Sequence, residues 1–242
     1  MTAISHPAPI EAYAPVRPAI RSTMAEAIAF VRPTPIPAVD PTLPQGNGQP
    51  VLVLPVIGRG DVHVAPMRAA LDQLGYRSFG WGLGTNIGPT PRLLAGIEHR
   101  LLALHAQHGP IDVAGFSLGG VFARLLAHLH PGKVRQVATV CSPFREPVDS
   151  TFLPLRPFLP AWRTPDLLEI ANQVAQPLPV SGTFIFSRND GIVAWQSCIE
   201  PSQPEDCFEI PGLHVTINRD PDVLAILARR FARKTGISAR RI

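Results

Sequence analysis

The sequence predicts one α/β domain with a mostly parallel sheet of about six strands and helices on both faces. Two observations carry this prediction. Short, continuous apolar runs alternate with segments of helical periodicity, and 242 residues are enough for one large core. Hydrophobic residues make up 45% of the chain and charged residues 17%, which is a globular composition. We expect the domain over residues 21–242, after a disordered, proline-containing tail over residues 1–20.

The elements of this domain can be placed in order along the chain. Met24, Ala27 and Ile28 recur at helical spacing and predict a short helix over residues 22–31 that docks on the domain. Buried strands are expected at residues 51–54, 76–81, 111–116, 134–141, 183–186 and 207–210. The helices between and after them are expected at residues 64–74, 91–107, 118–130 and 221–234.

Residues 142–179 interrupt this alternation with a cluster of prolines and aromatic side chains. Their position and composition predict a small apolar cap over a substrate pocket, with Phe152, Phe158 and Trp162 as its lining. The alternative is a long surface excursion with no role in binding.

The segment Gly115-Phe116-Ser117-Leu118-Gly119 follows an apolar strand and opens an apolar helix. This G-x-S-x-G pattern in that context is typical of a nucleophile elbow, in which the serine stands exposed on a sharp turn. An ordinary strand-to-helix connection with a serine cap is the alternative. The residues that follow favour the elbow, because Asp190 and then His214 come later in the chain, in the order serine, acid, histidine.

Ser117 needs a base and a group that orients the base, since a serine hydroxyl is a weak nucleophile near neutral pH. His214 lies between the last strand and the final helix, where a loop at the carboxyl edge of the sheet reaches the serine. Asp190 follows a strong strand and fits the role of the acid. The sequence therefore predicts Ser117, Asp190 and His214 as the catalytic residues.

A reacting carbonyl also needs an oxyanion hole made of preorganised N–H donors. The N–H of Leu118, directly after the nucleophile, is one expected donor. The second is expected from the loop after the first strand, at Ile57 or, one residue earlier, at Val56. A valine in this loop restricts its backbone, because a positive φ is costly for a β-branched residue.

With these residues in place, the chain resembles the lipase and esterase branch of the α/β-hydrolase superfamily over about residues 51–233. The segments Gly80-Trp81-Gly82-Leu83-Gly84-Thr85-Asn86-Ile87-Gly88-Pro89 and Ser187-Arg188-Asn189-Asp190-Gly191-Ile192-Val193, with Trp195, are similar to a group of small bacterial lipase-like hydrolases. The resemblance implies hydrolysis of a small-molecule or lipid ester through an acyl-serine intermediate, without a cofactor. An acyltransferase on the same triad, or a noncatalytic binding module of the same fold, are the alternatives.

Other classes of function find little support. No cluster of residues has the spacing of metal ligands, and we expect no metal. The net charge of +4 comes largely from a basic C-terminal stretch that has no interleaved aromatic residues after Phe231, so nucleic-acid binding is not expected. No apolar run approaches the roughly 18 residues of a membrane span, and no integral membrane association is expected.

The N-terminus lacks the pattern of a secretory signal, and three cysteines form no disulfide framework, so a cytoplasmic location is expected. Cys198 and Cys207 flank a short loop and could form a bridge, although two reduced thiols are favoured. The oligomeric state stays open.

Overall fold

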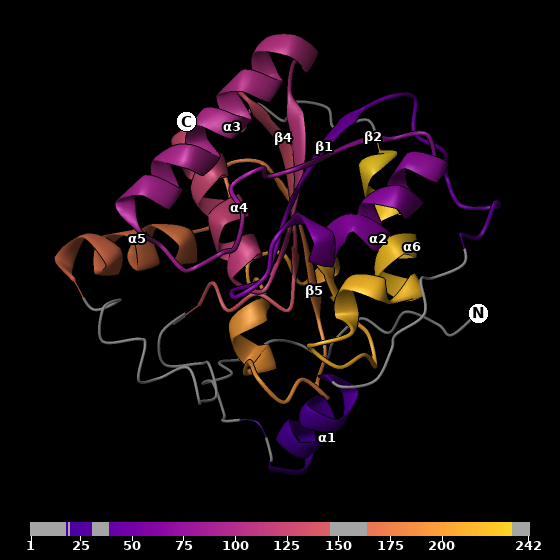
Figure 1. Cartoon of the computed structure of the whole chain (residues 1–242), viewed down its shortest axis with the longest axis vertical. Coiled ribbons are helices and arrows are strands. Elements are labelled where there is room, and N and C mark those ends of the chain that lie inside the picture. Colours follow the sequence, from indigo (N-terminus) through magenta and orange to yellow (C-terminus); the bar gives the residue numbers. More distant parts are fainter. Residues whose placement is uncertain (1–17, 19, 31–38, 146–163, 234–242) are drawn as a thin grey trace.

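The computed structural model describes residues 18, 20–30, 39–145 and 164–233 (Figure 1). Its centre is a six-stranded sheet with the order β2-β1-β3-β4-β5-β6. In the described part of the chain, all five neighbouring strand pairs are parallel. The strands are β1 (Pro50–Leu54), β2 (Arg77–Gly80), β3 (Ile111–Phe116), β4 (Val134–Val140), β5 (Ser181–Phe186) and β6 (Cys207–Glu209).

The helices form two layers, one on each face of the sheet (Figure 1). Helices α3, α4 and α5 lie on one face, and α2 and α6 lie on the other. A further helix, α1, lies beyond the end of the sheet. The bounds are α1 (Ile20–Phe30), α2 (Asp61–Gln73), α3 (Pro91–His108), α4 (Leu118–Leu129), α5 (Pro165–Ala175) and α6 (Pro221–Phe231).

Strand β1 is apolar on both sides because each face of the sheet packs against helices. In β1, Leu52 and Leu54 belong to the hydrophobic cluster under α3, α4 and α5, whereas Val51 and Val53 belong to the cluster under α2 and α6. All four side chains are fully buried. This is the pattern that a parallel sheet between two helical layers requires, and it explains why the runs in the sequence are continuous.

Helix starts follow local signals in the sequence. Thr90 caps α3 by accepting a hydrogen bond from the N–H of Leu93 at 3.2 Å, and Asp220 caps α6 by accepting from the N–H of Asp222 at 2.9 Å. A proline occupies the first turn in both helices, where its missing N–H and fixed φ do no harm.

Two local expectations differ from the structure. The helix expected at residues 22–31 is present as α1, but two of the apolar residues that predicted it face solvent: Met24 is 62% exposed and Ile28 is 52% exposed. Among the α1 side chains that the structure describes, residues 21–29, Glu26 is the buried one. Within residues 142–179, the structure also contains α5, which the proline-rich composition did not predict, packed against α4. The three cap residues Phe152, Phe158 and Trp162 lie outside the described residues.

Candidate active site

The parallel strands end at one edge of the sheet, and the residues selected from the sequence follow these ends. Leu54 of β1 pairs with Gly115 of β3, and Phe186 of β5 pairs with Glu209 of β6. The loop after β1, the elbow after β3, the acid turn (residues 187–193) after β5 and the histidine loop (residues 210–216) after β6 therefore meet at the carboxyl edge. This edge is where open α/β sheets generally bind their ligands.

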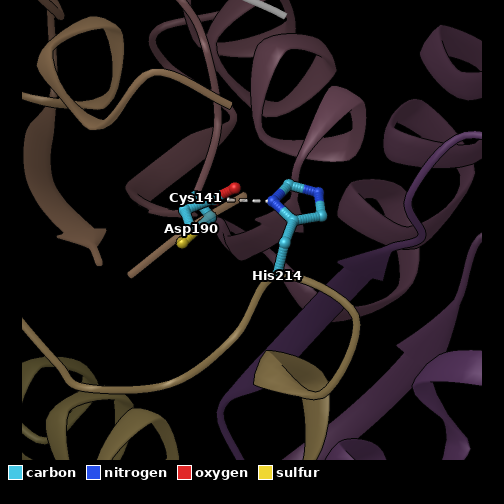
Figure 2. A group of neighbouring side chains, drawn as sticks. All are labelled: Cys141, Asp190 and His214. Carbon is cyan, nitrogen blue, oxygen red and sulfur yellow. Dashed lines mark hydrogen bonds and ion pairs between the residues drawn. The ribbon is translucent and has the colours of Figure 1, made fainter. Parts of the chain in front are cut away.

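Asp190 and His214 form a buried hydrogen-bonded pair (Figure 2). Their Oδ2 and Nδ1 atoms lie 2.7 Å apart. The second carboxylate oxygen of Asp190 accepts hydrogen bonds from the N–H groups of Ile192 at 2.8 Å and Val193 at 2.7 Å. The carboxylate is thus fixed by its own turn and directed at the imidazole.

This pairing determines the tautomer of His214. A carboxylate can only accept, so Nδ1 of His214 carries the proton and Nε2 is left as the acceptor. Burial lowers the pKa of His214, but the charge and hydrogen bond of Asp190, with the charge of Glu26, outweigh burial and raise this pKa above its usual value. The arrangement is that of a general base oriented by an acid.

Cys141 lies beside this pair at the end of β4 (Figure 2). Ligand atoms of Cys141, Asp190 and His214 lie within 4.8 Å of one another. These residue types can bind zinc, but two of the three groups are engaged with each other. Burial, followed by the charge of Asp190, raises the pKa of the Cys141 thiol well above its usual range. A fully buried thiol of this kind is unsuited to act as the nucleophile.

Ser117 sits in a strained turn, as an elbow requires. Its φ is 52° and its ψ is −122°, a conformation that L-residues rarely adopt. The N–H of Ser117 donates to the carbonyl of Val140 at 2.8 Å, which ties the turn to β4. A Cβ at Gly115 would overlap the backbone of Gly119, and a Cβ at Gly119 would lie 2.8 Å from the carbonyl oxygen of Pro55. Both motif glycines are therefore required by close backbone contacts.

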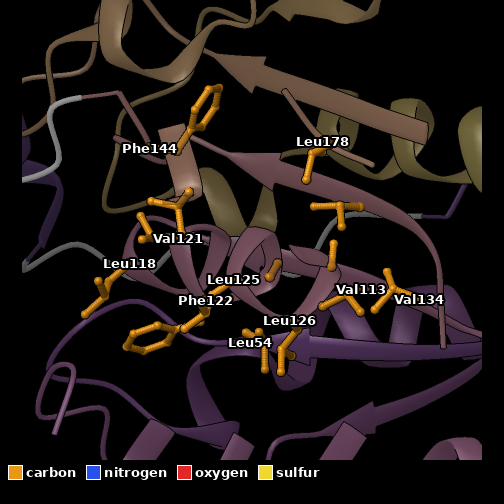
Figure 3. Packing of buried hydrophobic residues seen from close by; sticks show 14 of the residues in the cluster. Leu54, Val113, Leu118, Val121, Phe122, Leu125, Leu126, Val134, Phe144 and Leu178 are labelled. Carbon is orange, nitrogen blue, oxygen red and sulfur yellow. The ribbon is translucent and has the colours of Figure 1, made fainter. Parts of the chain in front are cut away.

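Helix α4 holds the elbow from behind. Figure 3 shows Phe122, Leu125 and Leu126 of α4 beside Leu54 and Val113 of the sheet, all within one hydrophobic cluster. Because this helix is buried on nearly every side, the direction in which the chain leaves Ser117 is fixed.

Ser117 and His214 are not joined by a hydrogen bond. In the described part of the chain, the hydrogen bonds of the site include the Asp190–His214 bond but none from Ser117 Oγ. Both residues are 7% exposed. The structure therefore brings Asp190 and His214 together directly and places Ser117 at the same edge. Contacts between a catalytic serine and histidine are often long without substrate.

The loop after β1 makes its turn at a glycine. Gly58 has a φ of 74°, and among the described non-glycine residues only Ser117 and Cys141 have positive φ. The left-handed residue of this loop is therefore Gly58, and Val56 does not need the positive φ that is costly for a β-branched residue. Among the described residues, the N–H groups of Val56, Ile57 and Leu118 donate to none of the backbone carbonyls in loops, turns or caps. These three donors stay available, so the choice between Val56 and Ile57 stays open.

Asn86 supports this loop and was not selected from the sequence. Its side-chain amide donates to the carbonyl of Pro55 at 2.9 Å and accepts from the N–H of Gly88 at 3.1 Å. The N–H of Gly58 in turn donates to the Asn86 carbonyl at 2.7 Å. The segment of residues 80–89 therefore braces the proposed oxyanion loop. In the sequence, the signal for this role was an asparagine within a glycine-rich loop, and its burial is visible only in the structure.

Two further expectations from the sequence concern a disulfide bridge and a membrane span. Cys198 and Cys207 are buried free thiols, so no bridge joins them in this structure. No helix in the described ranges is both long and apolar enough to cross a membrane.

Comparisons with known proteins identify the fold. A monoacylglycerol lipase from Paleococcus ferrophilus superposes with a TM-score of 0.57 at 14% identity, over 78% of this chain and 95% of that one. A metagenome-derived lipolytic enzyme, from work on LipS and LipT, superposes with a TM-score of 0.54 at 17% identity, over 83% of this chain and 99% of that one. The pyrethroid hydrolase PytH superposes with a TM-score of 0.51 at 16% identity, over 76% of this chain and 97% of that one.

No family model and no curated protein sequence matches the chain. The structural similarity nevertheless shows that the chain has the α/β-hydrolase fold, as the sequence predicted. At these identities the similarity concerns the fold alone.

Proposed function

We propose that the protein is a serine hydrolase that cleaves carboxylic esters through an acyl-serine intermediate on Ser117. The observation that carries this proposal is the buried hydrogen bond of 2.7 Å between Asp190 and His214, at the same sheet edge as the strained serine turn. The fold is shared with a lipase and a lipolytic enzyme, which supports ester hydrolysis as the class of reaction.

In the first half of the reaction, Nε2 of His214 takes the proton of Ser117 Oγ as this oxygen attacks the ester carbonyl carbon. The carbonyl oxygen becomes an oxyanion, which accepts hydrogen bonds from the N–H of Leu118 and from Ile57 or Val56. His214, now an imidazolium stabilised by Asp190, gives its proton to the leaving alcohol. The carbon–oxygen bond of the ester breaks, and the acyl group stays on Ser117.

In the second half, water replaces the alcohol. His214 takes one proton from water, the resulting hydroxide oxygen attacks the acyl-serine, and the tetrahedral intermediate uses the same N–H donors. Collapse releases the carboxylic acid while His214 returns the proton to Ser117 Oγ. An alcohol in place of water makes the protein an acyltransferase with the same residues.

The substrate is a small-molecule or lipid ester with an apolar acyl group, if Phe152, Phe158 and Trp162 form the cap that the sequence predicts. Esters of graded chain length, tested with and without added alcohols, separate hydrolysis from acyl transfer. Release of free acid alone supports the hydrolase, and formation of a new ester supports the transferase.

A fluorophosphonate probe tests the nucleophile directly. We expect the purified protein to be labelled at Ser117, because the probe forms a covalent bond only with an activated serine. Ser202→Ala, which removes an exposed serine distant in sequence from the elbow, should be labelled as the wild type is. A wild-type protein that stays unlabelled, under conditions that label a control hydrolase, would favour the noncatalytic module.

Ser117→Ala should lower ester turnover by about 10⁴-fold or more, because no nucleophile remains. The thermal midpoint should stay nearly unchanged, since alanine keeps the Cβ and the elbow glycines. Both are measured on the purified variant with p-nitrophenyl esters and by thermal denaturation. Retained turnover would place the nucleophile elsewhere.

A further inference from the structure

Helix α1 brings a buried carboxylate, that of Glu26, to the candidate site. Glu26 is 3% exposed, and its oxygens accept three backbone hydrogen bonds from residues more than 160 positions away. Oε1 accepts from the N–H of Gly191 at 3.0 Å and from the N–H of His214 at 2.7 Å. Oε2 accepts from the N–H of Val215 at 3.0 Å. One side chain therefore joins the acid turn to the histidine loop.

The chemistry of these contacts requires an acceptor with two oxygens. Three N–H donors converge on Glu26, and an ionised carboxylate is the side chain that only accepts. An amide offers one acceptor oxygen, and its NH₂ group would face a donor. Burying a carboxylate is unfavourable unless hydrogen bonds compensate, and three N–H groups supply this compensation.

Two neighbouring contacts fix the position of α1 on the acid turn. The hydroxyl of Thr23 donates to the carbonyl of Gly191 at 2.9 Å. A Cβ at Gly191 would lie 2.5 Å from the carbonyl oxygen of Ser22, so helix and turn touch backbone to backbone. The apolar Met24 and Ile28 are exposed, so the contacts with the acid turn come from the polar Glu26 and Thr23 and from the backbone of Ser22.

We propose that Glu26 is a positioning residue of the active site: its carboxylate holds the acid turn and the histidine loop together so that Asp190 faces His214. The proposal rests on the proposed function, since it assigns Glu26 a role toward that acid and base. It makes α1 part of the catalytic machinery, although this helix precedes the first strand of the sheet.

The charge of Glu26 also acts on His214. Several titratable groups surround this imidazole: Asp190 and Cys141 lie beside it, Glu26 binds its backbone, and His63 of α2 interacts with it electrostatically. Burial and the charges of Arg59, Arg219 and His214 lower the pKa of His63 to about 4, so His63 is neutral near pH 7. Glu26 and Asp190 are then the negative groups that favour the imidazolium.

Glu26→Gln tests the proposal with little change of shape. We expect kcat to fall by about 10- to 100-fold with a smaller change in KM, because misplacement of the base affects the chemical step more than binding. We also expect the pKa of His214 to fall, since the amide carries no charge. The acid limb of the kcat profile should therefore move to lower pH. Glu26→Asp keeps the charge and should retain the pKa better than Glu26→Gln.

A matched control is Glu169→Gln, which makes the same change at an exposed position of α5. It should leave kcat and the pKa of His214 at wild-type values. Thr23→Val removes the hydrogen bond from the Thr23 hydroxyl to the carbonyl of Gly191, so it separates docking of the helix from the effect of the carboxylate itself. We expect Thr23→Val to leave the pKa of His214 near its wild-type value.

The titration of His214 is followed by NMR of histidine-labelled protein, with His214→Asn for assignment, and needs no substrate. If wild-type protein has no nucleophilic serine but Glu26→Gln lowers the pKa of His214, the proposed function fails and the contact between Glu26 and the histidine loop stands. A folded Glu26→Gln protein with unchanged kcat and unchanged His214 pKa would overturn the positioning role, even if its thermal midpoint were lower.

Discussion

The turn at Ser117, the proposed nucleophile, is built around contacts between its own sequence neighbours, whereas the proposed acid and base are held together by residues from distant parts of the chain. Gly115 packs against Gly119 within one turn, and α4 begins at Leu118 directly after the serine. His214, by contrast, meets Asp190 at a sequence separation of 24 residues and Glu26 at a separation of 188. A local motif can be recognised in a sequence, but a base that depends on three segments has to be assembled by folding.

Of the substitutions that test the pair of Asp190 and His214, Asp190→Asn should have the largest effect on kcat. We expect kcat to fall by about 10³- to 10⁴-fold, because asparagine no longer holds the Nδ1–H tautomer of His214 or stabilises the imidazolium. The exposed Asp166→Asn on α5 is the control and should be neutral. Ester turnover is the measurement, and a loss of less than tenfold would remove Asp190 from the acid role.

Gly119→Ala tests the contact of the elbow that reaches beyond its own turn. The added Cβ meets the carbonyl oxygens of Leu54 and Pro55, so we expect a loss of about 1–3 kcal/mol in the free energy of unfolding. Gly132→Ala adds a Cβ in open space and should change stability little. Urea denaturation measures both. Equal stability of the two variants would show that the elbow adapts to a side chain at position 119.

The pH dependence of kcat/KM tests the electrostatics of the pair of Asp190 and His214. His214 must be neutral at Nε2 to accept the proton of Ser117, so activity rises as pH increases through the pKa of His214. Because Asp190 and Glu26 raise this pKa despite burial, we expect the acid limb to have an apparent pKa above 6.5. An acid limb centred below 6.5 would contradict this expectation.

Ser117→Gly should have the smallest effect, and it should raise the free energy of unfolding, whereas Gly119→Ala should lower it. A glycine adopts φ of 52° without strain, which relieves about 1–3 kcal/mol, while the greater freedom of the unfolded glycine offsets about 0.5–1 kcal/mol. We expect a net gain of about 1 kcal/mol in the free energy of unfolding. Ser117→Ala keeps the Cβ and hence the strain, so it serves as the control, and urea denaturation compares the two. A destabilised Ser117→Gly protein would show that the elbow stores no strain.

Local patterns predicted most of the fold. All six expected strands are present with bounds within one or two residues. The signal is clearest for β1, whose buried residues Val51, Leu52, Val53 and Leu54 form a continuous apolar run. Helix α5 was missed even though Thr164 and Pro165 begin it and Val174 is buried within it. The prolines around it concealed this start signal.

The candidate site was predictable to a different degree for each part. Ser117 was marked by two glycines, and Asp190 and His214 by their order after strands. Asn86 and Glu26 had no comparable signal, because the sequence does not show which polar residue is buried against distant backbone groups. For α1 the pattern predicted the helix but not its contacts, since Met24 and Ile28 are exposed and Glu26 binds the acid turn and the histidine loop.

The sequence by itself predicted the serine turn and the alternation that builds the sheet, because both leave patterns in residues that are close together in the chain. Only the tertiary structure decided how Glu26 joins the acid turn to the histidine loop. Those contacts form between backbone N–H groups and side chains brought together by the parallel sheet, and hydrogen bonds to backbone leave no residue pattern in the loops that donate them.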